Sequence, residues 1–122
     1  MSQYEDAVGR YFTAWNATDD EARAAAVAAA WTEDGSYTDP LAEVSGHVDL
    51  TAAIGGVQQQ FPGFEFRVVG AVDGHHDTAR FSWELVSVAD GSAPVAGSDV
   101  ITLASDGRIA GVFGFLDRVP SA

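Results

Sequence analysis

The sequence lacks cysteine, is poor in basic residues and contains no long apolar run. Without cysteine, no disulfide, thiol nucleophile or thiolate metal site can form. Six basic side chains stand against 18 acidic ones, and this excess of negative charge repels the phosphates of a nucleic acid. Nowhere do about 18 apolar residues follow one another, as a membrane span requires, and the first ten residues do not resemble a secretion signal. We therefore expect a cytoplasmic protein that binds neither nucleic acid nor membrane.

The length and the hydrophobic share of the chain predict one folded domain over residues 1–122. A chain of 122 residues is long enough for one hydrophobic core. Its 47% of hydrophobic residues is far above the content of a disordered chain. No internal repeat, low-complexity stretch or linker divides it.

The first half of the chain carries helical patterns. Ser2 and Glu5 have the spacing of a capping box, in which the hydroxyl accepts an early helix N–H and the carboxylate returns to the cap. The apolar and aromatic residues that follow recur at helical spacing, which predicts a helix that ends near residues 16–19. They are Tyr4, Val8, Tyr11 and Trp15. The alanine-rich residues 20–31 predict a second helix, and residues 46–60 a third.

The second half carries strand patterns and turn signals. Strands are predicted by aromatic and β-branched residues or by alternation over residues 64–69, 78–88, 95–104 and 108–116, with a short one over 36–38. Turns are expected at Asp73-Gly74, Asp90-Gly91 and Ser105-Asp106-Gly107. Helices followed by a meander of long strands predict an α+β fold, with the helices packed on one face of a curved, mostly antiparallel sheet. A pocket between the two layers is the place to look for function.

Asp39 is the first candidate for chemistry. It lies where the chain leaves the helical layer, and Pro40 restricts its backbone to extended dihedrals. A carboxylate moved from water toward an apolar pocket is a better general base near neutral pH. Aspartate before proline is also common in loops, so a turn residue without chemistry is the alternative.

Asp99 and Tyr11 are the second and third candidates. Alternation places Asp99 on the same apolar face as Ile101 and Leu103, where a carboxyl group is either paired or neutral. A neutral carboxyl can donate a hydrogen bond to a ligand oxygen, whereas the alternative is a hydrated aspartate near the strand edge. Tyr11 lies on the core-facing stripe, and its hydroxyl needs either a ligand carbonyl or a local partner.

Other motifs favour surface positions. His75 and His76 are adjacent, so their side chains point to opposite faces, and no third ligand follows at zinc-like spacing. We therefore predict a solvated turn and no metal site. Arg80 and Glu84 share the face opposite Trp83 and are expected to form a surface or dimer-face pair. Neither a serine-nucleophile elbow nor a phosphate-binding loop is present.

Three stretches resemble the nuclear transport factor 2 superfamily, in its ketosteroid isomerase and SnoaL-like branches. They are RYFTAWNATDD, WTEDGSYTDPLAEVSGH and SDVITLASDGRIAGVFGFLD, and the resemblance covers nearly the whole chain. It implies a cone-shaped fold, with three N-terminal helices packed on a strongly curved sheet that encloses a pocket. It also implies a homodimer formed through the open face of the sheet, with Arg80, Glu84 and Val86 on that face.

The same resemblance implies a mechanism. In the ketosteroid isomerases, the residues that Tyr11, Asp39 and Asp99 match are an oxyanion donor, the proton-shuttling base and a protonated second oxyanion donor. Asp39 would move a proton from the carbon next to a ketone while Tyr11 and Asp99 stabilise the dienolate, without metal or cofactor. Leu116, Ile54 and Trp31 stand where the isomerases have polar aromatic residues.

The ligand implied is small and hydrophobic. We expect it to contact aromatic and aliphatic side chains from both layers: Trp15, Trp31, Ile54, Phe61, Phe81, Trp83, Ile101, Phe113 and Phe115. The alternative is a non-catalytic protein that binds an apolar molecule or serves as a dimerisation module, since one fold hosts many functions. If Asp39 and Asp99 face one cavity, catalysis is favoured.

Overall fold

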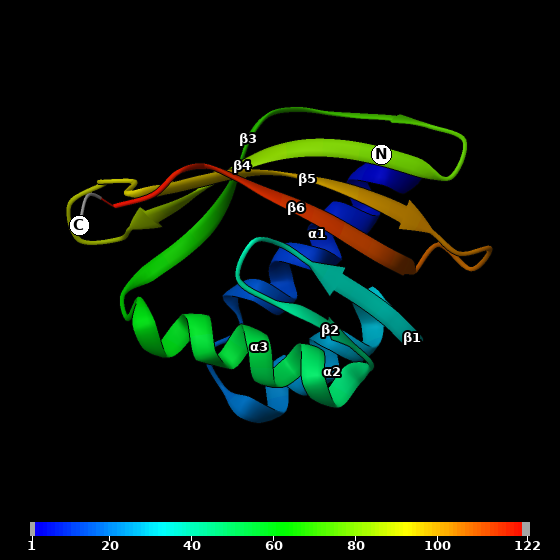
Figure 1. Cartoon of the computed structure of the whole chain (residues 1–122), viewed down its shortest axis with the longest axis horizontal. Helices are drawn as coiled ribbons and strands as arrows, with labels where there is room; N and C mark the ends of the chain where they lie inside the picture. Colours follow the sequence, from blue (N-terminus) through cyan, green and yellow to red (C-terminus); the bar gives the residue numbers. More distant parts are fainter. Residues whose placement is uncertain (1, 121–122) are drawn as a thin grey trace.

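Residues 2–120, which the computed structural model describes, form three helices and six strands (Figure 1). In chain order these are α1 (Gln3–Asn16), α2 (Asp20–Ala30), β1 (Trp31–Thr38), β2 (Glu43–Ser45), α3 (His47–Gln60), β3 (Phe64–His75), β4 (Thr78–Ser87), β5 (Val95–Leu103) and β6 (Ile109–Arg118). None of these helices has the length and apolar character needed to cross a membrane.

The strands form one mixed sheet in the order β2-β1-β6-β5-β4-β3. Only the β1–β6 pair is parallel among the described strands, and every other neighbouring pair is antiparallel. The helices lie on one side of the sheet (Figure 1). The predicted α+β fold, with helices on a curved, mostly antiparallel sheet, is confirmed.

The helix starts follow from their capping residues. Ser2 Oγ accepts from Glu5 N at 3.1 Å and Glu5 Oε1 from Ser2 N at 3.2 Å, so the predicted capping box is present. Asp19 caps α2 by accepting from Ala22 N at 2.9 Å. A cap of this kind stabilises a helix by about 1 kcal/mol. α1 is thereby fixed in a register that buries Tyr11 toward the sheet.

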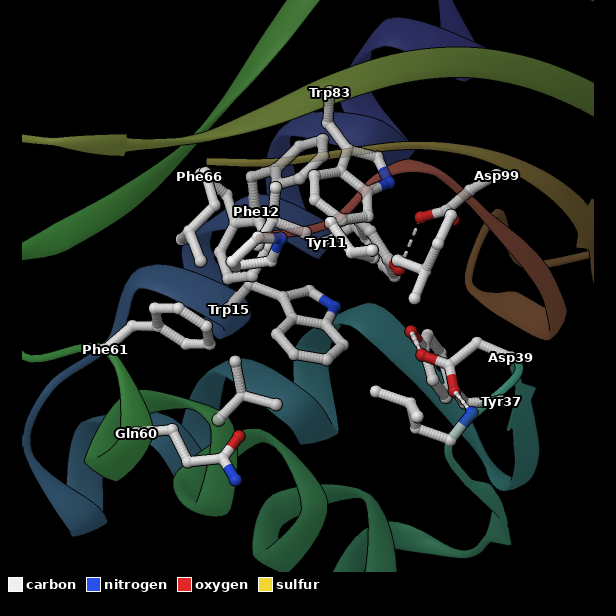
Figure 2. Close-up of a pocket in the computed structure, with 17 residues that line it drawn as sticks. Tyr11, Phe12, Trp15, Tyr37, Asp39, Gln60, Phe61, Phe66, Trp83 and Asp99 are labelled. Carbon is white, nitrogen blue, oxygen red and sulfur yellow. Dashed lines mark hydrogen bonds between the residues drawn. The ribbon is translucent and has the colours of Figure 1, made fainter. Parts of the chain in front are cut away.

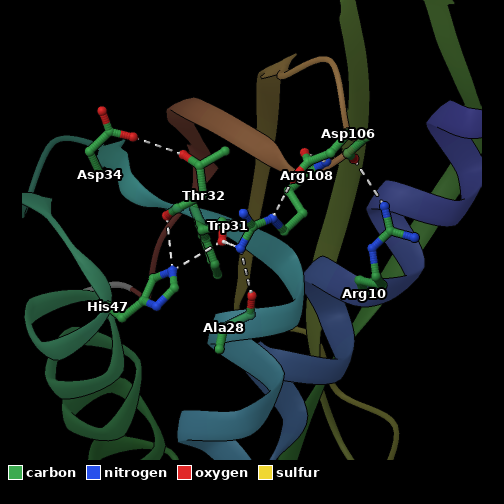
Figure 3. Close-up of polar contacts among 9 residues, drawn as sticks. Arg10, Ala28, Trp31, Thr32, Asp34, His47, Asp106 and Arg108 are labelled. Carbon is green, nitrogen blue, oxygen red and sulfur yellow. Dashed lines mark hydrogen bonds and ion pairs between the residues drawn. The ribbon is translucent and has the colours of Figure 1, made fainter.

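A group of polar contacts fixes the junction between α2 and β1 (Figure 3). The alanine-rich helix ends at Ala30, one residue earlier than expected, and Trp31 is the first residue of β1. Its carbonyl accepts from Arg108 Nη1 at 3.3 Å and from His47 Nε2 at 3.0 Å. His47 Nε2 also lies 2.9 Å from the Thr32 carbonyl, so this nitrogen carries the proton, because both partners are acceptors. These contacts tie α3 and the β5–β6 hairpin to the strand that ends at the site.

The predicted turn at Asp73-Gly74 is wrong. β3 continues through both residues to His75, and the turn follows at His76-Asp77, with His76 at φ 49°. A Cβ on Gly74 would lie 2.5 Å from Cγ of Tyr4. The glycine therefore serves the close approach of the Tyr4 ring from α1, and not a turn.

The expected pair of Arg80 and Glu84 does not form. Arg80 Nε lies 3.2 Å from Asp73 Oδ2, and Glu84 Oε2 lies 2.8 Å from Arg118 Nη2. Arg80 pairs with the residue directly opposite it on β3, whereas Glu84 pairs with a residue of β6 across the intervening β5. Val86, expected on the open face, is buried.

Gly97 makes room for one wall of the pocket. It lies opposite Trp83 in the β4–β5 ladder. A Cβ on Gly97 would lie 2.4 Å from the Trp83 ring and 2.5 Å from the Phe115 carbonyl oxygen. Because a backbone atom is one of these neighbours, a side chain here cannot be accommodated by rotating a single rotamer. Gly97 thus allows the indole to lie flat against β5.

We predict that Gly97→Ala lowers the free energy of unfolding by about 1–3 kcal/mol, because the added methyl overpacks Trp83 and the β6 backbone. Gly9→Ala is the matched control: nothing lies within 4 Å of its added Cβ, on a helix. The control should raise the free energy of unfolding by about 0.5–1 kcal/mol. Urea denaturation measures both, and equal stability of Gly97→Ala and wild type would contradict the packing described.

Candidate active site

An apolar cavity of about 270 Å³ lies between the helices and the sheet (Figure 2). Its walls come from α1, α3, β1 and its following loop, β3, β4, β5, β6 and the segment after β6. Six of the residues expected at the site line it: Tyr11, Trp15, Asp39, Phe61, Trp83 and Asp99. Most of the remaining wall is aromatic or aliphatic, so the few polar groups decide what the cavity can do.

Asp99 and Tyr11 form a buried pair at this cavity. Tyr11 Oη donates to Asp99 Oδ2 at 2.7 Å, and each residue is 2% exposed. Asp99 Oδ1 accepts no hydrogen bond from residues 2–120. Burial raises the pKa of Asp99 to about 6, opposed by the contacts of Tyr11 and Trp83, while the negative charge of Asp39 reinforces the rise. Near neutral pH, both protonation states of Asp99 are therefore accessible.

Two indole N–H groups near this pair have no hydrogen-bond partner among the described residues. Nε1 of Trp83 and Nε1 of Trp15 are buried and make no hydrogen bond within the described chain. Figure 2 shows the Trp83 nitrogen directed toward the carboxyl group of Asp99. A buried N–H of this kind is costly to leave unpaired. The Trp83 N–H thus lies close to one carboxyl oxygen of Asp99, while the Tyr11 hydroxyl donates to the other.

Asp39 is held differently from Asp99. Tyr37 Oη donates to its Oδ2 at 2.5 Å, and the backbone N–H groups of Leu41 and Ala42 donate to its Oδ1 at 2.8 Å each. Asp39 is half-buried. Burial raises the pKa of Tyr37, so its hydroxyl remains a donor to the carboxylate. These three donors fix the orientation of Asp39 at the edge of the cavity.

The side chains of Asp39 and Asp99 both lie next to Gly114 of β6. A Cβ on Gly114 would lie 2.8 Å from Asp99 Oδ1 and 3.4 Å from Asp39 Cβ. Both residues line the same cavity. The glycine therefore permits a close approach of both side chains to the β6 backbone, which a methyl group at this position would prevent. One buried and one half-buried aspartate thus line the same cavity.

Four residues expected to contact a ligand lie in the core outside the cavity lining: Trp31, Ile54, Phe81 and Ile101. Trp31 and Phe81 pack against the ring of Tyr11, with centroid distances of 5.4 and 5.6 Å. They therefore support Tyr11 from behind. The expectation that they touch a ligand is corrected, because an apolar strand or helix pattern does not distinguish the core from a cavity wall.

The expected positions of Phe113 and Phe115 are wrong. Both side chains are exposed, at 45% and 60%. In the β5–β6 ladder Leu103 pairs with Ile109 but Thr102 pairs with Gly111, so β6 carries one extra residue. This bulge reverses the alternation that starts from the buried Ile109, since a shift of one residue exchanges the two faces of a strand. The side chain that reaches the cavity from β6 is Leu116.

Several lining residues were missed by the sequence interpretation. Tyr37 lies two residues before Asp39, and this spacing places both side chains on one face of an extended strand. That signal was available. Phe12 and Phe66 line the cavity from α1 and β3, whereas Leu41 and Val119 come from segments without a periodic pattern. Neither His75 nor His76 lines it, and no cluster of three potential metal ligands occurs within residues 2–120.

Comparisons with known proteins agree with this fold. The family model of the SnoaL-like domain matches residues 8–112. A solved structure of a candidate isomerase of the SnoaL-like family from Agrobacterium tumefaciens strain C58 is 42% identical, with a TM-score of 0.90 over 96% of this chain and 99% of that one. A search of curated proteins finds no match.

A more distant structure shows the same fold. A candidate SnoaL-like polyketide cyclase from Jannaschia sp. CCS1 is 21% identical, with a TM-score of 0.75 over 94% of this chain and 85% of that one. At this identity the likeness concerns the fold alone. The match of the family model over most of the chain, together with the Agrobacterium structure, confirms the predicted relationship: the chain belongs to the SnoaL-like family.

Proposed function

We propose that the protein is a cofactor-independent isomerase or cyclase-like enzyme that transfers a proton at the carbon next to the ketone of a hydrophobic substrate. The observation that carries this proposal is the convergence of Asp39 and Asp99 on one apolar cavity. Two carboxyl groups in unlike environments can act as base and acid in one reaction. The name of the Agrobacterium relative, a candidate isomerase, also supports it.

Asp39 acts as the base. Its carboxylate takes a proton from the carbon next to the ketone, and the electron pair of that C–H bond moves toward the carbonyl oxygen as a dienolate forms. Asp39 then returns the proton to a carbon further along the conjugated system, and the carbonyl is restored. A positioned base of this kind contributes about 10²–10⁴-fold to the rate.

The Tyr11–Asp99 pair stabilises the dienolate oxygen. When Asp99 is ionised, it accepts the hydroxyl hydrogen of Tyr11, which is then not available to a ligand. When Asp99 is protonated, the pair holds two hydrogens and can donate to the ligand oxygen. The protonated form of Asp99 is therefore the one that binds an oxyanion. Loss of one such donor costs about 10²–10³ in rate in other enzymes.

A second candidate function is binding of a small molecule without catalysis. It is favoured by the three hydrogen bonds that Asp39 accepts, which leave its carboxylate with fewer free lone pairs. In that case Asp39 would shape the mouth of the cavity, and Asp99 would bind a carbonyl oxygen.

We predict that Asp39→Asn lowers the rate of isomerisation of β,γ-unsaturated cyclic ketones to their conjugated products by about 10²–10⁴-fold. The reaction is followed by the ultraviolet absorbance of the conjugated product. A two-ring ketone and a 3-ketosteroid are the substrates to compare. Asp34→Asn, at an exposed position of the same strand, is the matched control and should retain wild-type rates. Unchanged turnover by Asp39→Asn would refute the role of Asp39, and binding of the conjugated product without any wild-type turnover would favour the second candidate.

The conjugated enone product provides a test of Asp99, because its carbonyl oxygen only accepts hydrogen bonds. Burial raises the pKa of Asp99 to about 6, so the donating, protonated form predominates below that pH. We predict that enone affinity, measured by calorimetry, is constant below pH 6 and falls by up to about tenfold per unit above it. In Asp99→Asn the amide does not titrate and this pH dependence should disappear. Enone affinity that rises with pH in wild type would be inconsistent with the assignment.

A further inference from the structure

We infer that the cavity selects an uncharged ketone of one or two rings and rejects substrates that carry a carboxylate or phosphate near the rings. This inference rests on the proposed function, because it names the class of substrate for the same site. Three features of the molecule carry it: the charges at the cavity, the positions of all basic side chains, and the size and stiffness of the walls.

Among the described residues that line the cavity, the charged side chains are all acidic. Asp39 and Asp99 are the charged or chargeable carboxyl groups, and Gln60 supplies an uncharged amide at the rim. Tyr11 and Tyr37 have raised pKa values, because both are buried, and so remain neutral hydroxyls. An anionic group brought beside Asp39 would meet a like charge in a poorly hydrated space.

Every basic side chain is committed elsewhere. The six basic residues are all arginines. Five form ion pairs, with Asp20, Glu65, Asp73, Asp106 and Glu84 as partners. The remaining one, Arg10, donates to the Gly107 carbonyl at 3.0 Å. No arginine or histidine is found among the described residues that line the cavity, so nothing there can compensate the charge of an anionic ligand.

The cavity is small and its walls are mutually packed rings. Its volume of about 270 Å³ is below the range of roughly 300–1,000 Å³ that drug-sized ligands occupy. Phe66 stacks edge to face on Trp15 at 5.1 Å and on Trp83 at 5.2 Å. Since these rings hold one another in place, enlarging the cavity would break several contacts at once. One or two flat rings fit such a space, and a four-ring ligand would extend past the exposed Leu41 at the mouth.

Binding of matched phenols by the full chain tests this inference independently of turnover. The ligands to compare are 2-naphthol, its 6-carboxylate and its 6-carboxamide, which differ in charge but little in size, and the four-ring phenol estradiol. Their affinities are to be measured by isothermal titration calorimetry near pH 6. The carboxamide should bind about as well as 2-naphthol. The carboxylate and estradiol should each bind about tenfold more weakly. A ratio below about fivefold for either compound would overturn the inference.

Two variants assign the cause of the selectivity. Asp39→Asn removes the charge and Gln60→Arg adds a cation at the rim; each should raise the affinity of the carboxylate relative to that of the carboxamide. If neither variant does so, charge is not the basis of selection and the inference fails. Failure of the proposed function would be seen separately, as absent isomerisation with the binding pattern intact. Failure of the inference would leave isomerisation intact and the binding pattern absent.

Discussion

The hydrogen bond between Tyr11 and Asp99 is the interaction on which the rest of the site depends. It joins α1 to β5 across the interior, where both side chains are almost completely buried. A carboxyl group in this place must be paired or neutral, because an unpaired buried charge is strongly unfavourable. Tyr11 satisfies one oxygen, and Trp31 and Phe81 fix the phenol ring from behind. This contact thus joins α1 and β5 at the polar end of the cavity.

The two aspartates acquire different properties from their surroundings alone. Asp99 lies on an apolar strand face, and burial raises its pKa to about 6. Asp39 is half-buried at the edge of the same cavity and accepts hydrogen bonds from Tyr37 and two backbone N–H groups. A carboxyl group that is kept neutral can donate a hydrogen bond, while a second, ionised carboxyl group at the same cavity can act as a base. Gly114 makes this arrangement possible, since a side chain there would collide with Asp99.

Periodic patterns explain how much of this could be predicted from the sequence. The helices, the order of the strands and the inward direction of Tyr11 and Asp99 follow from spacing, which is a local property of the chain. The outward direction of Phe113 and Phe115 could not be predicted, because it depends on a bulge in the pairing of β6 with β5. Gly74 looked like a turn residue, because the Tyr4 ring that requires a glycine there lies 70 positions away in the sequence. Each of these predictions was wrong because contacts between residues far apart in the sequence determine the local structure there.

The most direct measurement is the titration of the Asp99 side-chain carboxyl carbon by ¹³C NMR in the free protein, with the signal assigned by its absence from Asp99→Asn. The account predicts a midpoint near pH 6, because burial outweighs the contacts with Tyr11 and Trp83. Such a midpoint would mean that the neutral carboxyl needed for oxyanion binding is populated close to neutral pH. A midpoint near 3.8, the ordinary pKa of aspartate, would mean that Asp99 is an ionised structural residue, and would contradict the central claim.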